Sequence, residues 1–179
     1  MSENFDFDAV IRKVPDFPKP GILFYDITSI LENPEAVEAA QKELDRLFRP
    51  DTYDALLGVE SRGFIFSSIT AHLHKKPLYL ARKPGKLPNP TVSQSYDLEY
   101  GSASLEIQKI DLEKGAGKRW LVIDDLIATG GTLEATCSLL TGNGVEIAGI
   151  FSLVGLPFLG FHDKLKNFRT ETLMDYESE

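Results

Sequence analysis

Short apolar runs alternate with helix-like segments through most of this chain, and that alternation constrains the fold more than any other feature. The apolar runs, each expected to form a buried strand, lie at 55–59, 78–81, 120–123 and 145–154. The helical patterns lie at 34–48, 63–74 and 132–140. Strands that alternate with helices predict an α/β fold, in which helices flank a central parallel sheet and ligands bind at the carboxyl ends of the strands.

The segments outside this alternation give weaker signals. Residues 7–13 have the pattern of a short amphipathic helix, and the proline-rich residues 14–21 favour an extended loop. Residues 84–101 are rich in Pro, Gly, Asn and Ser without periodicity, which predicts a long functional loop. Residues 103–108 alternate apolar and polar, as in a strand with one exposed face. The 179 residues suit one domain, 1–179.

Charge and cysteine content narrow the function classes. The net charge of -8 argues against non-specific nucleic-acid binding, which needs a basic field, but it leaves room for a local anion site. The lone cysteine, Cys137, suggests a reducing compartment and therefore a cytoplasmic protein. The acidic N-terminus is unlike a signal peptide, and no apolar run is long enough to span a bilayer, so no membrane association is expected.

The segment 120–132 carries the most chemistry. An apolar strand runs into two carboxylates, then into a turn of small residues, then into a helix. Gly130 and Gly131 let backbone amides approach a ligand that a Cβ atom would obstruct, and the hydroxyls of Thr129 and Thr132 add donors. Together with the helix N-terminus, the turn that begins at Ala128 predicts a site for a phosphate monoester.

Asp124 and Asp125 precede that turn, and carboxylates beside a phosphate would repel it. They are therefore expected to face a neutral hydrogen-bond donor, which the two hydroxyls of a ribose provide. An ordinary strand–turn–helix connection, with glycine for geometry and aspartate for solubility, is the alternative. Two other phosphate motifs, the P-loop and the dinucleotide-binding glycine pattern, do not occur in the sequence.

This segment resembles the phosphoribosyl-pyrophosphate (PRPP) signature of type I phosphoribosyltransferases. Four further segments resemble adenine phosphoribosyltransferases and follow the same order: 16–24, 60–64, 82–88 and 96–101. The resemblance implies the type I phosphoribosyltransferase fold, with a small N-terminal hood within 1–33 that covers the base and a flexible catalytic lid at 84–101. It also implies the conversion of adenine and PRPP to AMP and pyrophosphate in purine salvage, by a protein that is generally a homodimer.

Residues 60–63 lie at a second strand–helix junction. Their amides and the Ser61 hydroxyl suit a second anion, although Ser61 could instead cap the helix. The resemblance implies that Glu60 and Ser61 meet pyrophosphate and that Arg62 reaches the nucleotide and the base. Three nearby cations form either a solvated face or part of the pyrophosphate site: Arg82, Lys83 and Lys86.

The resemblance also implies how the purine is held. Phe24 would stack on adenine, although a phenylalanine is more often a core residue, and backbone groups of Leu23 and Tyr25 would contact the edge of the base. Many relatives have Arg where this chain has Tyr25. Glu99 is the candidate for proton transfer with the purine, with Tyr100 beside it, and an exposed loop carboxylate is the alternative.

No His/Cys cluster is apparent, so no protein residue is assigned to a metal, and Mg²⁺ is expected to bind mainly through PRPP and pyrophosphate. Two rival functions remain open. One is a phosphoribosyltransferase for 6-oxopurines. The other is a regulatory phosphoribosyl-binding module, which would usually carry an additional DNA-binding domain.

Overall fold

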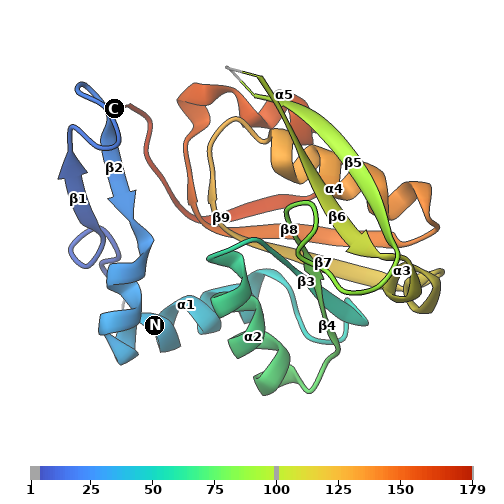
Figure 1. Cartoon of the computed structure of the whole chain (residues 1–179). Coiled ribbons are helices and arrows are strands. Elements are labelled where there is room, and N and C mark those ends of the chain that lie inside the picture. The colour runs from blue at the N-terminus through green and yellow to red at the C-terminus, as the bar shows by residue number, and fades with distance from the viewer. Residues whose placement is uncertain (1–4, 99–100, 179) are drawn as a thin grey trace.

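A five-stranded parallel sheet forms the centre of the protein, as the computed structural model shows for residues 5–98 and 101–178 (Figure 1). The strand order is β4-β3-β7-β8-β9, and every neighbouring pair is parallel. The strands are β3 (Ala55–Val59), β4 (Leu78–Ala81), β7 (Arg119–Ile127), β8 (Glu146–Gly155) and β9 (Thr170–Asp175). The predicted α/β class and the predicted sheet are confirmed, although β9 had no counterpart among the expected strands.

Helices cover both faces of the sheet, so alternate residues of a strand enter two separate cores. Leu56 and Leu121 pack toward α1 (Pro34–Leu47) and α2 (Gly63–His74). Leu57 and Val122 pack on the other face, where α3 (Lys109–Gly115), α4 (Gly131–Gly142) and α5 (Phe161–Leu165) lie with the short η2 (Pro157–Leu159). Burial on both faces explains why the strands appear in the sequence as continuous apolar runs.

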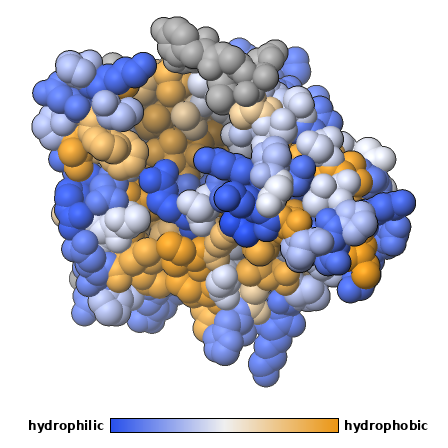
Figure 2. Space-filling model, in the orientation of Figure 1, coloured by the Kyte–Doolittle hydropathy of each residue, from blue (hydrophilic) through white to orange (hydrophobic). Residues whose placement is uncertain are grey.

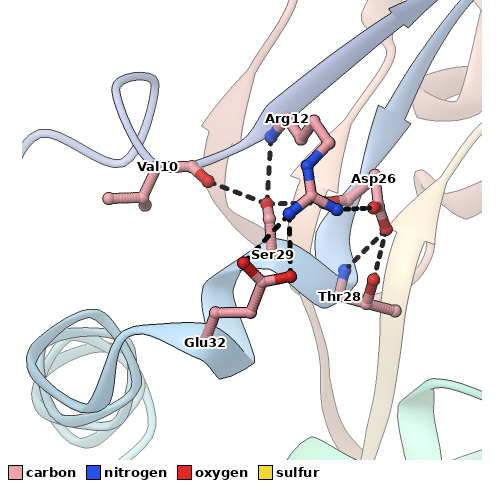
Figure 3. Close-up of polar contacts among 6 residues, drawn as sticks. All are labelled: Val10, Arg12, Asp26, Thr28, Ser29 and Glu32. Carbon is pink, nitrogen blue, oxygen red and sulfur yellow. Dashed lines mark hydrogen bonds and ion pairs between the residues drawn. The ribbon is translucent and has the colours of Figure 1, made fainter.

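The hood is an antiparallel pair, β1 (Arg12–Pro15) and β2 (Leu23–Asp26), followed by η1 (Ile27–Glu32). The helix expected at 7–13 is wrong, because this segment turns and then enters β1. Figure 3 shows the contacts that hold it: Arg12 binds Asp26 at 2.9 Å and Glu32 at 2.7 Å, while its backbone N–H donates to the buried Ser29 hydroxyl. Strand pairing and these bonds outweigh a helical pattern of about two turns, which is too short to be stable alone.

The loop expected at 84–101 is partly wrong as well. Thr91–Leu98 is strand β5, which pairs in an antiparallel hairpin with β6 (Gly101–Gln108). Val92 and Tyr96 alternate toward the core on the α4 side, a period-two signal that the surrounding Pro and Gly residues obscured. The hairpin rises beside α4 in Figure 1.

Within the described residues, no helix has the length and apolar character needed to cross a membrane.

Candidate active site

The two predicted anion-binding junctions lie at neighbouring strands. β3 and β7 pair in parallel, with Gly58 opposite Ile123, so both strands end at the same edge of the sheet. The β3–α2 turn and the β7–α4 turn therefore open side by side, where open α/β sheets bind ligands. Figure 2 shows this face of the molecule hollowed between the hood on the left and the rest of the chain.

The β7–α4 turn has the backbone geometry of an anion site. Gly130 is left-handed, with φ +78°, and α4 begins at the next residue. The first-turn amides of a helix have no acceptor within the helix, so they remain available to a ligand. Thr129 and Thr132 are half-buried beside them. The sequence predicts that a Cβ atom at Gly130 would obstruct the ligand, but the structure directs that Cβ atom at Phe161, 3.1 Å from that residue's Cβ atom.

Asp124 and Asp125 lie inside β7 and not after it, because pairing with β8 continues to Ile127. Both side chains are buried, and Asp124 Oδ1 accepts the Asp125 backbone N–H at 2.9 Å. Burial, and then the carboxylate of Asp125, hold the pKa of Asp124 well above its ordinary value. A buried acid with a raised pKa is unfavourable in the free protein, and groups of this kind cluster at functional sites.

Gly63 allows α2 to approach these acids. A Cβ atom there would lie 2.7 Å from the Ile123 carbonyl oxygen and 3.0 Å from the Asp124 Cα atom. Both neighbours are backbone atoms that cannot rotate away, so only glycine fits. The N-terminus of α2 is thereby held directly against the acidic end of β7.

Arg62 links this acidic pair to the hood. Its Nε atom lies 2.6 Å from Asp125 Oδ2, and its guanidinium lies 5.7 Å from the centre of the Phe24 ring on β2. This contact is an ion pair and not a hydrogen bond, because Asp125 Oδ2 has no hydrogen-bond partner among the described residues. Phe17 packs edge-on against Phe24, with 5.0 Å between ring centres. The residues predicted to contact ribose and base are thus brought together.

The second junction is densely charged. Glu60 accepts the Lys83 backbone N–H at 2.8 Å and pairs with Arg82 at 3.2 Å, while Arg82 also donates to the Lys86 carbonyl. Burial acts to raise the pKa of Glu60, but the Lys83 amide and Arg82 outweigh it and hold that pKa below its ordinary value. The peptide bond that joins Glu60 to the exposed Ser61 is cis. The capping alternative for Ser61 is wrong, since α2 has Arg62 at its N-cap without a capping side chain.

The candidate base-binding residues lie on β2, where successive side chains alternate between faces. Phe24 is half-buried and faces Arg62, so its role as an ordinary core residue is not what the structure favours. Tyr25 is buried on the opposite face and stacks on Tyr176, with 3.8 Å between ring centres. Sequence reasoning missed Tyr176, because nothing local to that tyrosine indicates a partner so far away in the chain. Glu99 and Tyr100 lie outside the described residues.

Among the described residues, no group of three or more His, Cys, Asp or Glu side chains converges in a way that could hold a metal ion.

Comparison with known proteins places this arrangement in a family. The phosphoribosyl transferase domain model matches residues 26–166, which run from the last residue of β2 through both junctions to the residue after α5. The chain therefore belongs to the phosphoribosyltransferase family.

Similar proteins and solved structures show which kind of phosphoribosyltransferase this chain resembles. The chain is 49% identical to the adenine phosphoribosyltransferase of Treponema denticola over 172 residues, covering 96% of this chain and 90% of that protein. It also matches the crystal structure of the enzyme from Thermoanaerobacter pseudethanolicus with a TM-score of 0.88 and 36% identity, covering 94% and 97% of the two chains. The structure from Giardia lamblia, complexed with 9-deazaadenine, matches with a TM-score of 0.87 and 33% identity, covering 96% of each chain. Within the phosphoribosyltransferases, the chain is a member of the adenine phosphoribosyltransferase family.

Proposed function

We propose that this protein converts adenine and PRPP to AMP and pyrophosphate in purine salvage. The observation that carries the proposal is the position of Arg62, which joins the buried acid at Asp125 to the Phe24 ring of the hood. A ribose bound at the acids would thus have a phosphate turn on one side and an aromatic base site on the other. The solved relative from Trypanosoma brucei is described in complex with AMP, pyrophosphate and ribose-5-phosphate.

The reaction joins N9 of adenine to C1 of the ribose. The C1–O bond to pyrophosphate breaks, its electron pair leaves with pyrophosphate, and N9 loses its proton. Positive charge develops on the sugar, beside Asp124 and Asp125. Their carboxylates stabilise this charge and accept hydrogen bonds from the ribose hydroxyls. The residues 128–132 hold the 5-phosphate, and the β3–α2 turn with Arg82, Lys83 and Lys86 holds the leaving pyrophosphate. Positioning and the exclusion of water supply most of the rate.

Magnesium is part of this proposal. The acidic end of β7 offers carboxylate oxygens, which are the donors that Mg²⁺ prefers, but Arg62 already occupies one of them. This donor set fits an ion held mainly by the phosphate oxygens of PRPP. The ion would neutralise charge on the leaving pyrophosphate. Activity should therefore disappear with EDTA and return with added Mg²⁺.

Glu99 is proposed to accept the N9 proton, and it follows β5 directly in the sequence. The residues 84–101 would act as the lid, which closes over the reacting sugar. Glu99→Leu should lower kcat much more than it lowers PRPP affinity, because the side chain would act on the purine and not on the phosphates. A normal rate, measured where chemistry limits turnover, would remove Glu99 from the mechanism and leave Tyr100 as the next candidate.

Base selection is the direct test of the function. The protein, Mg²⁺ and PRPP are incubated with adenine, hypoxanthine or guanine in turn, and the nucleotide is identified by mass. We expect AMP, with far slower formation of IMP and GMP, because the hood has no lysine at 23–25 to receive a 6-oxo group. Equal turnover of hypoxanthine would leave only the phosphoribosyltransferase class, and binding without turnover would favour the regulatory module.

We also propose a cytoplasmic homodimer. Cys137 is a free, buried thiol, which suits a reducing compartment. On α2, Ile65 and Leu73 are exposed two turns apart, and Figure 2 shows an apolar patch over the lower part of the molecule, where α2 lies. Sedimentation equilibrium should give twice the chain mass, and Leu73→Glu should shift it toward the monomer.

A further inference from the structure

The end of the chain connects the two halves of the site. After β9, the C-terminal segment leaves the sheet and runs to the hood, where Figure 1 shows it beside β2. Its start is tied to the sheet, because the Tyr176 N–H donates to the Gly155 carbonyl at 3.0 Å. Gly155 pairs with Ile127, the last residue of β7 before the phosphate turn. The segment is therefore anchored next to that turn.

The side chain of Tyr176 contacts three parts of the hood. Its ring stacks on Tyr25 of β2, with 3.8 Å between centres and 17° between planes. Its hydroxyl donates to Asp8 at 2.7 Å, and Lys13 of β1 lies 5.4 Å from the ring centre while it pairs with Asp8 at 2.6 Å. One residue thus holds the N-terminal segment, β1 and β2 against a segment that is fixed to the sheet.

The stack also determines which way β2 faces. Because side chains alternate along a strand, burial of Tyr25 against Tyr176 turns Phe24 to the opposite face, toward Arg62. The contacts of Arg12 with Asp26, Ser29 and Glu32 in Figure 3 lie within the hood itself, so they shape it without reaching the phosphate turn. Besides the contacts of Arg62 with Asp125 and Phe24, a second link between the base side and the phosphate side of the site therefore passes through Tyr176.

We propose that Tyr176 is a positioning residue for the purine: its stack on Tyr25 holds the base-contacting strand at a set distance and orientation from the phosphate turn. This inference rests on the proposed function. Tyr176 itself touches neither base nor phosphate in this assignment. Its loss should therefore affect adenine and leave PRPP unaffected.

Three variants test this proposal. Tyr176→Ala removes the ring, Tyr176→Phe keeps the ring and loses the bond to Asp8, and Glu177→Ala changes the next, exposed residue of the same segment. Loss of one ring stack should raise the KM for adenine about two- to tenfold in Tyr176→Ala. The KM for PRPP and kcat should stay near wild type, Tyr176→Phe should retain most of the affinity, and Glu177→Ala should match the wild type.

Hydrogen exchange provides a readout that does not depend on activity. In Tyr176→Ala the amides of 23–26 should exchange faster, while those of 120–127 keep their protection. Should this variant not fold, Tyr176→Leu, which keeps bulk without an aromatic stack, provides the same comparison. Unchanged exchange at 23–26, or an equal rise in both KM values, would overturn the proposal. A wild type that forms no AMP would count against the proposed function alone, because exchange still decides whether Tyr176 holds β2.

Discussion

The turn from β7 to α4 and the turn from β3 to α2 leave neighbouring strands at the same edge of the sheet, but they are built from different groups. The first consists of small residues and hydroxyls, with Gly130 left-handed and backbone amides left open. The second is dense with charge: Glu60 already holds Arg82, and Arg62 already holds Asp125. The same topology thus carries one turn without charged side chains and one turn whose cations are already paired with carboxylates.

The difference matches what each site has to do in the proposed reaction. The 5-phosphate stays bound from substrate to product, and fixed amides need no rearrangement to hold it. Pyrophosphate has to bind and then leave. The guanidinium of Arg82 pairs with Glu60, so this carboxylate would compete with pyrophosphate for the same cation. An Arg82 without that partner would hold the leaving group more tightly.

The largest effect is expected at Gly130, in the neutral turn. Gly130→Val places a β-branched residue at φ +78° and directs its Cβ atom at Phe161, so the turn has to move and its amides leave the phosphate. AMP affinity, measured by calorimetry, should fall roughly 10- to 100-fold, the equivalent of one or two charge-assisted hydrogen bonds. Thr129→Ala should cost less. Wild-type affinity in Gly130→Val would place the phosphate site elsewhere.

A substitution at Gly63, in the charged turn, tests how closely α2 packs against β7. The Cβ atom of Gly63→Ala would meet the backbone of Ile123 and Asp124, so unfolding in urea should show a loss of about 1–3 kcal/mol. Gly142→Ala is the matched control, because a Cβ atom there has nothing within 4 Å, and its stability should change by less than about 1 kcal/mol. Equal stability of the two variants would contradict the tight contact between α2 and β7.

Asp124 lies between the two turns and should show a conflict between stability and binding. Its pKa in the folded protein is raised above the ordinary value of 3.8, so folding favours the protonated side chain. This side chain therefore stabilises the fold fully below pH 3.8, and that stabilisation is lost as pH rises through the folded-state pKa. Asp124→Asn should therefore be more stable than the wild type at pH 7 by about 1 kcal/mol, with weaker AMP binding.

The pH dependence of that difference is the check. It should shrink toward zero as pH falls to 3.8, even though other carboxylates destabilise both proteins in acid. Glu177→Gln, which changes an exposed acid near the end of the chain, serves as the comparison for a generic charge change. A variant less stable than the wild type at pH 7 would show that Asp124 is satisfied by its neighbours.

The smallest effect is expected at the rim of the charged turn. Lys86 is exposed, and one exposed charge contributes about 0–1 kcal/mol, so Lys86→Ala should raise the KM for PRPP by no more than about fivefold. Salt should diminish the difference between variant and wild type, because the contact is screened. A loss that high salt leaves intact would mean that Lys86 is buried when PRPP binds.

Local patterns predicted the sheet and its main helices well. Residues 63–74 and 55–59 form the expected elements with the expected bounds, because burial on both faces or on one helical stripe leaves a strong periodic signal. The strand expected at 103–108 is confirmed as part of β6. Its partner β5 and the strand β1 were missed, because their sequence signals are short or interrupted by Pro and Gly and because pairing with another segment stabilises both strands.

The sequence by itself determined the fold class and the family, and it led to the proposed phosphate turn at 128–132, since all three depend on residues that are adjacent in the chain. Tertiary structure alone decided that Arg62 meets both Asp125 and Phe24, that Glu60 holds Arg82, and that Tyr176 stacks on Tyr25. Tyr25 and Tyr176 lie near opposite ends of the chain, so no local sequence pattern predicts their contact. They meet because β9 occupies the sheet edge and directs the chain end across to the hood, a consequence of the strand order and not of any motif.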